Sequence, residues 1–136
     1  MDWMRSHIGE AEVTGETATA FDKEVFSHTT DDEPINDGIM QAGCAATACA
    51  ALEETGFKST HDASAISFKE YGTPCQLQRD CIVVFEWDNG GHHVAFCDHI
   101  VDDNLVACLG GNQNSRVCVA TFSRKFIIAT RWPVTE

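Results

Sequence analysis

A cysteine, a histidine and an asparagine, far apart in the sequence, have the side chains best suited to chemistry. Cys44 follows a glycine and opens an alanine-rich segment. The free amide groups and the dipole of a helix N-terminus would favour its thiolate there. His93 begins an alternating segment, and Asn112 lies in a Gly-Gly-Asn-Gln-Asn stretch. A thiolate nucleophile, an imidazole base and a group that orients the base can together perform acyl transfer.

Strand alternation suggests how these side chains could meet. Alternation places His93 on one face of its strand with Ala95, and Val94 on the other face with Phe96. We expect the small-residue face, which carries His93, to meet the N-terminus of the cysteine helix. The neighbouring His92 points to the opposite face. If residues 93–101 and 105–109 form a hairpin, Asn112 returns beside His93 and could accept the imidazole N–H.

Each of these three residues also has a purely structural interpretation. Cys44 could be a packed thiol, His93 a histidine of the core, and Asn112 a turn residue in a loop rich in turn formers. Cys49, one turn further along the alanine-rich segment, is expected to serve packing.

The elements that must position these residues form two blocks along the chain. Helical spacing and glycine or proline stops predict helices over residues 2–9, 17–28, 43–55 and 61–71, with a polar loop over residues 29–38. Alternation and short turns then predict strands over residues 81–87, 92–101, 105–109, 116–122 and 125–132. This order predicts a single α+β domain over residues 1–136, with N-terminal helices packed on a C-terminal antiparallel sheet of about five strands.

Composition and charge exclude several classes of function. The 136 residues carry 21 acidic and 9 basic side chains, for a formal net charge of −12. Sequence-independent binding to nucleic acid needs a basic surface, and an anionic membrane would repel this chain. The longest apolar runs have strand length, so no membrane insertion is expected. The N-terminus lacks the layout of a signal peptide, which predicts synthesis in the cytoplasm with reduced thiols.

Neither the cysteines nor the acidic residues predict a metal site, and we expect no cofactor. The seven cysteines include no Cys-x-x-Cys pair, so core packing is favoured over zinc binding. The acidic residues between positions 31 and 37 do not fit a calcium-binding EF-hand loop, so a solvated loop is favoured, although the sequence leaves calcium binding open.

An ordered series of short motifs spans nearly the whole chain: Ile8-Gly9-Glu10-Ala11-Glu12-Val13-Thr14-Gly15, Gly43-Cys44-Ala45-Ala46, Tyr71-Gly72-Thr73-Pro74, Asp80-Cys81-Ile82-Val83-Val84-Phe85, Gly91-His92-His93-Val94-Ala95-Phe96, Leu109-Gly110-Gly111-Asn112-Gln113-Asn114 and Arg131-Trp132-Pro133. Each motif is weak alone, whereas their order is fairly specific. The series resembles small cell-wall hydrolases of the NlpC and CHAP types, especially a phage-encoded subgroup.

This resemblance implies a papain-like fold and a cysteine hydrolase that cleaves amide bonds of peptidoglycan. It implies Cys44 as the nucleophile, His93 as the base and Asn112 as the orienting residue. The enzyme would be an endopeptidase or an N-acetylmuramoyl-L-alanine amidase. It would act at the periplasmic cell wall, in phage lysis or as part of a phage tail or secretion assembly.

Two positions depart from the family pattern. Gly43 stands where the family usually has an aromatic residue, and His92 stands where it usually has glycine. These departures affect the substrate groove and leave His92 as a second contributor to the site. We assign substrate binding to His92, Gly43 and Gln113, which flank the three catalytic candidates.

Two alternatives are kept open, of which the first belongs to a different class. The chain could be a non-catalytic structural or adaptor protein of a virion that retains the fold. It could also be a deamidase or an acyltransferase that uses the same three residues on a protein substrate.

Overall fold

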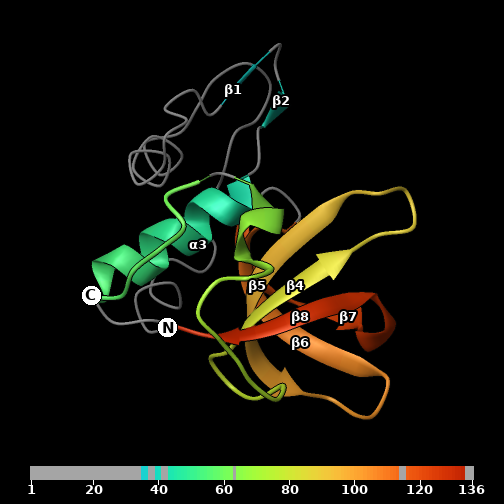
Figure 1. The fold of residues 1–136 in the computed structure, drawn as a ribbon. Coiled ribbons are helices and arrows are strands. Elements are labelled where there is room, and N and C mark those ends of the chain that lie inside the picture. Colours follow the sequence, from blue (N-terminus) through green and yellow to red (C-terminus); the bar gives the residue numbers. More distant parts are fainter. Residues whose placement is uncertain (1–34, 37–38, 41–42, 63, 114–115, 134–136) are drawn as a thin grey trace.

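The computed structural model describes residues 35–36, 39–40, 43–62, 64–113 and 116–133 (Figure 1). A short hairpin of β1 (Ile35–Asn36) and β2 (Ile39–Met40) precedes the helix α3 (Gly43–Glu54). The remaining elements follow in the order η1 (Ala65–Phe68), β3 (Thr73–Pro74), β4 (Ile82–Glu86), β5 (His92–Ile100), β6 (Leu105–Gln113), β7 (Arg116–Ser123), η2 (Arg124–Phe126) and β8 (Ile127–Trp132).

The main sheet is antiparallel and has six strands in the order β3-β8-β4-β5-β6-β7. β4, β5, β6 and β7 are neighbours in sequence as well as in space, because short turns connect them. The last strand, β8, returns to the opposite side of β4 and pairs there with both β4 and β3.

The predicted fold class is wrong in its helical part. In the described residues, α3 is the one α-helix, and the structure consists mostly of the six-stranded sheet rather than of N-terminal helices packed on five strands. The predicted helices over residues 2–9 and 17–28 lie outside the described residues. The segment predicted as a polar loop, residues 29–38, contains the strand β1. The strand of the main sheet that the sequence analysis does not predict is β3.

The segment 61–71 does not form the predicted helix because its polar side chains take over the backbone hydrogen bonds. His61 has a positive φ of 52°, and the Asp62 carboxylate accepts from the Ser64 N–H at 3.0 Å. The Ser67 hydroxyl donates to the Ser64 carbonyl at 2.6 Å. Such local bonds compete with a helix, so only the 3₁₀ turn η1 forms.

The predicted cysteine helix is confirmed as α3. Alanine favours helix strongly, and the helix ends in a glycine stop as the sequence predicts. Gly56 has a φ of +87°, its N–H donates to the Glu53 carbonyl at 3.3 Å, and the Phe57 N–H donates to the Leu52 carbonyl at 2.9 Å. This pair of bonds is the Schellman motif, which satisfies the last carbonyls of a helix.

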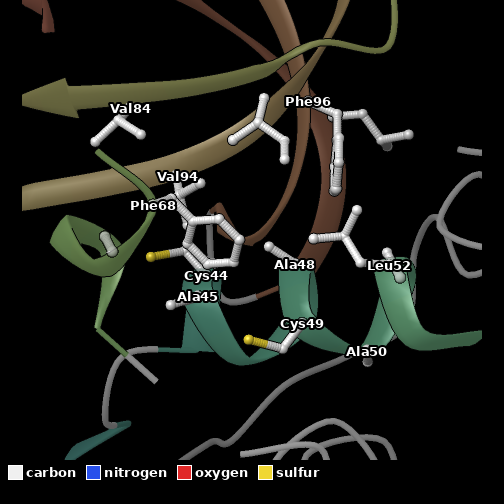
Figure 2. Packing of buried hydrophobic residues seen from close by; sticks show 14 residues of the cluster. Cys44, Ala45, Ala48, Cys49, Ala50, Leu52, Phe68, Val84, Val94 and Phe96 are labelled. Atoms are coloured by element: carbon white, nitrogen blue, oxygen red, sulfur yellow. The ribbon is translucent and has the colours of Figure 1, made fainter. Parts of the chain in front are cut away.

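The sheet separates two apolar layers. On one side α3 and η1 pack on large strand side chains, among them Val84, Val94 and Phe96 (Figure 2). On the other side a second cluster gathers smaller strand residues such as Ala95 with the aromatic Phe85. Aromatic residues of β7 and η2 pack against this second cluster. Alternation along each strand therefore sends every second residue to a different layer. We call these the helix-side layer and the aromatic-side layer.

The turn between β4 and β5 fixes the positions of His92 and His93 at the start of β5. The Trp87 N–H donates to the Gly91 carbonyl at 2.8 Å, and the Gly90 N–H donates back to the Trp87 carbonyl at 2.9 Å. Gly90 has a φ of +85°, and the Asn89 carboxamide accepts from the Gly91 N–H at 2.9 Å. A side chain at Gly90 would meet no atom within 4 Å, so the cost of a substitution there is one of backbone conformation.

We therefore predict that Gly90→Val destabilises the protein by about 1–2 kcal/mol, the cost of a left-handed conformation for a residue with a β-carbon. Gly90→Asn is the matched control and is expected to cost clearly less, because asparagine tolerates this conformation. Urea unfolding of the three proteins measures both effects. Equal losses for valine and asparagine would contradict the conformational explanation.

The buried thiols of the aromatic-side layer make stability depend on alkaline pH. Burial raises the pKa of the Cys81 thiol from 9.0 to about 12, and burial also raises the pKa of Cys108. Above pH 9 the unfolded chain loses thiol protons that the folded chain keeps, so the free energy of unfolding falls as the pH rises. The slope reaches at most about 1.4 kcal/mol per pH unit for each thiol.

Urea unfolding in the presence of a reductant, at a series of pH values from neutral to alkaline, measures this loss. The variant Cys81→Val removes one titrating group and is expected to show a shallower alkaline decline than the unmodified chain. The same decline in both proteins would show that Cys81 does not contribute.

Candidate functional site

Cys44 lies in the first turn of α3, as the sequence predicts. Its side chain is 6% exposed and belongs to the helix-side layer. Figure 2 shows its sulfur beside the ring of Phe68, beneath the strand that carries Val94. The first turn of a helix presents free backbone N–H groups, which stabilise a thiolate and any negative charge that develops beside it. The position therefore suits a nucleophile, and the packing limits its access to solvent.

Cys49 is the internal comparison for Cys44. It is fully buried in the middle of the same helix, and its sulfur lies 3.6 Å from the Asp62 carbonyl and 3.7 Å from the Thr60 hydroxyl. Burial raises its pKa. A buried thiol with a raised pKa is chemically inert, in agreement with the predicted packing role of Cys49.

His93 lies on the face of the sheet that turns away from α3, which corrects the expected meeting of its face with the helix. Its ring packs in the aromatic-side layer, with centroid distances of 6.0 Å to Phe85, 6.2 Å to Trp87 and 5.4 Å to Phe122. The side chain is 7% exposed. The catalytic role of His93 stays a prediction.

The volumes of the side chains explain why this expectation fails. α3 presents small residues such as Ala48 to the sheet, so the large side chains of Val94 and Phe96 are needed to fill the space. The opposite layer contains several aromatic rings, and β5 contributes the smaller side chains of Ala95 and Cys97 to it. Cores pack at nearly constant density, so the small-residue face of β5 turns toward the aromatic rings rather than toward the helix.

His92 is the histidine on the helix side of the sheet. It precedes Val94 by two residues, which places both on one face, and it pairs across the turn with Glu86. Its Nε2 donates to the Glu86 Oε1 at 3.0 Å. The His92 and Glu86 side chains are 27% and 51% exposed, so this pair is open to solvent. A hydrogen bond at Nε2 leaves Nδ1 as the basic nitrogen of the neutral ring.

Asn112 lies on a strand rather than in the predicted loop, because β6 continues to Gln113. β5 and β6 pair in the register Phe96↔Leu109. Between Gly110 and Gln113 the register of β6 with β7 shifts. Asn112 lies on the strand next to that of His93, and the predicted return of Asn112 beside His93 stays a prediction.

The predicted substrate-binding positions are found in three different elements. Gly43 is the first residue of α3, His92 is the first residue of β5, and Gln113 ends β6, where it pairs with Arg116 of β7. Gly43 therefore adjoins Cys44 in sequence, and Gln113 lies on the strand next to the one that begins with His92.

Glu86 is the polar residue of this region that the sequence analysis misses. The signal is available in principle, because Glu86 and His92 flank the turn over residues 87–91 symmetrically. Residues that flank a hairpin turn stand opposite each other on one face of the sheet. An acid and a histidine at such positions can pair.

The described residues show neither a metal site nor a membrane-spanning helix, and similarity to known proteins identifies no family. In the described part of the chain, no group of three or more His, Cys, Asp or Glu residues is placed to hold a metal ion. The described helices include none that is long and apolar enough to cross a membrane. The acidic residues between positions 31 and 37 lie outside the described residues. No protein-family model, no curated protein and no solved structure matches the chain.

Proposed function

We propose that this chain is a cysteine hydrolase that cleaves amide bonds of peptidoglycan, with Cys44 as its nucleophile. One observation carries the proposal: Cys44 in the first turn of α3 and the hydrogen-bonded pair of His92 and Glu86 lie on the same side of the sheet. The choice of substrate rests on the motif series that resembles small cell-wall hydrolases.

The geometry favours His92 over His93 as the base. Val94 shares the helix-side layer with Cys44, and His92 stands two residues from Val94 on the same face, about 7 Å along the strand. Glu86 then takes the orienting role, because a carboxylate bonded to Nε2 fixes the tautomer and stabilises the imidazolium. His93 with Asn112 is the competing assignment, which the motif series supports.

In this mechanism His92 Nδ1 takes the proton of the Cys44 thiol, and the thiolate attacks the carbonyl carbon of the amide. The backbone N–H groups at the start of α3, including that of Cys44, stabilise the oxyanion. The imidazolium returns the proton to the amine as it leaves, and a thioester remains on Cys44. His92 then deprotonates a water molecule that hydrolyses the thioester.

The nucleophile is tested with Cys44→Ala. We expect the purified protein to release soluble fragments from peptidoglycan sacculi and the variant to release none above background. Cys49→Ala is the matched control, since it removes a thiol of the same helix and should retain activity in the protein that folds. Equal fragment release by the unmodified chain and Cys44→Ala would contradict the proposal.

The base is tested with His92→Gln and His93→Gln. His92→Gln is expected to lower kcat by about 10²–10⁴-fold with little loss of stability, because general base catalysis contributes on that order and the side chain is partly exposed. His93→Gln is expected to lower stability, because its ring packs among aromatic side chains. Circular dichroism and urea unfolding separate the two effects. A folded His93→Gln variant without activity, beside an active His92→Gln, would assign the base to His93.

The burial of Cys44 favours a second candidate, a non-catalytic structural or adaptor protein. A thiol that is 6% exposed in an apolar layer is what packing alone requires. Alkylation by iodoacetamide below neutral pH, followed by mass spectrometry, separates the two candidates. An activated Cys44 reacts faster than Cys49, whereas equal inertness of both thiols would favour the adaptor.

A further inference from the structure

A surface cavity at the β3–β8 edge of the sheet lies outside the candidate catalytic site. Its volume is about 350 Å³, at the lower end of the range for small-ligand pockets. The segment after η1 and strands β3 and β8 supply the lining residues Lys69, Glu70, Pro74, Cys75, Ile128, Ala129, Thr130 and Arg131. Neither Cys44 nor either histidine of β5 is among them.

Two cations, Lys69 and Arg131, line this cavity in a strongly acidic chain. In the described residues, neither Lys69 nor Arg131 has a carboxylate within ion-pair distance. The whole chain carries a net charge of −12, so cations are scarce and acidic groups abundant. Two cations that line one cavity, and that make no ion pair with a described carboxylate, are suited to bind the carboxylate of a ligand.

The rest of the lining limits the ligand further. Glu70 contributes one carboxylate, which opposes a ligand that carries only negative charge and attracts an ammonium group. Pro74, Ile128 and Ala129 provide an apolar wall, and Ile128 is 36% exposed. The Thr130 hydroxyl already donates to the Cys75 carbonyl at 2.5 Å. The cavity thus combines two cations, one acid and a short apolar wall.

We propose that this cavity binds the zwitterionic end of a small amino acid, with Lys69 and Arg131 on its carboxylate and Glu70 on its ammonium group. The apolar wall takes a short aliphatic side chain. The inference goes beyond hydrolysis, since it needs neither Cys44 nor His92. In a peptidoglycan hydrolase such a cavity would hold a free amino-acid end of the substrate.

The test is titration of the ¹⁵N-labelled protein with alanine, with propionate and ethylamine as probes that carry only one of the two charges. We expect alanine at millimolar concentration to shift the amide signals of residues 69–70 and 128–131, and to bind more tightly than either single-charge probe. Arg131→Gln and Lys69→Gln should each weaken alanine binding about tenfold, the effect of losing one charge-assisted contact.

Two further variants make the outcome specific. Glu70→Gln should weaken the binding of alanine and strengthen that of propionate, a reversal that a merely structural role of Glu70 would not produce. Lys58→Gln changes the net charge equally at an exposed position outside the cavity and should bind alanine normally. Cys44→Ala should also bind normally, so failure of the hydrolase proposal leaves this one standing. No shift at these residues, or equal binding of alanine and propionate, would overturn it.

Discussion

The antiparallel pairing of β4 with β5 determines which side chains face each of the two apolar layers. These strands occupy the middle of the sheet, and their register pairs Val84 with Val94 and Phe85 with His93. Because alternation is strict within a strand, this register decides at once which side chains meet α3 and which meet the aromatic side chains of β7 and η2. The same register determines which of the two histidines, His92 or His93, lies on the side of the sheet that carries Cys44.

Packing volume, rather than polarity, selects this register. The alanines of α3 allow the helix to approach the sheet closely, and valine and phenylalanine side chains fill the remaining space. A shift of one residue would bring small residues such as Ala95 to the helix and leave a void there. The same shift would force Val94 and Phe96 into the layer that already holds Phe85 and Phe122.

The parts of the fold that the sequence predicts well are those decided by local rules. The bounds of α3 follow from alanine propensity and a terminal glycine, and the strands from β4 to β8 follow from alternation and turn residues. The predicted helix over residues 61–71 does not form, because serine and aspartate side chains of this segment compete for the backbone hydrogen bonds of a helix. β6 extends past its predicted end because its pairing with β7 includes Gly110 and resumes at Gln113 after a register shift, although the glycines there favour a loop.

For the candidate site, the sequence predicts the elements that carry Cys44 and His93 but not the face of the sheet on which His93 lies. Cys44 at a helix start follows from the local sequence, and Asn112 lies on β6, which pairs with the strand that carries His93. The face of β5 depends on the volumes of residues far away in the sequence, such as Phe122 on β7. Alternation along one strand contains no information about such contacts. The pair of His92 and Glu86 depends only on the turn between them, and cross-strand pairing rules would have found it.

Two consecutive histidines make the site unusually dependent on register. Neighbouring residues of a strand point to opposite faces, so only one of the two imidazoles can serve the helix side at a time. The sheet already contains register shifts between Val84 and Phe85 and between Cys97 and His99. One further bulge between His93 and Val94 would leave the packing of Val94 on α3 intact and turn His93 toward Cys44 instead of His92. In the proposed hydrolase, the pairing of the first two residues of β5 would therefore decide which histidine is the base, while the core layers on both sides of the sheet stay the same.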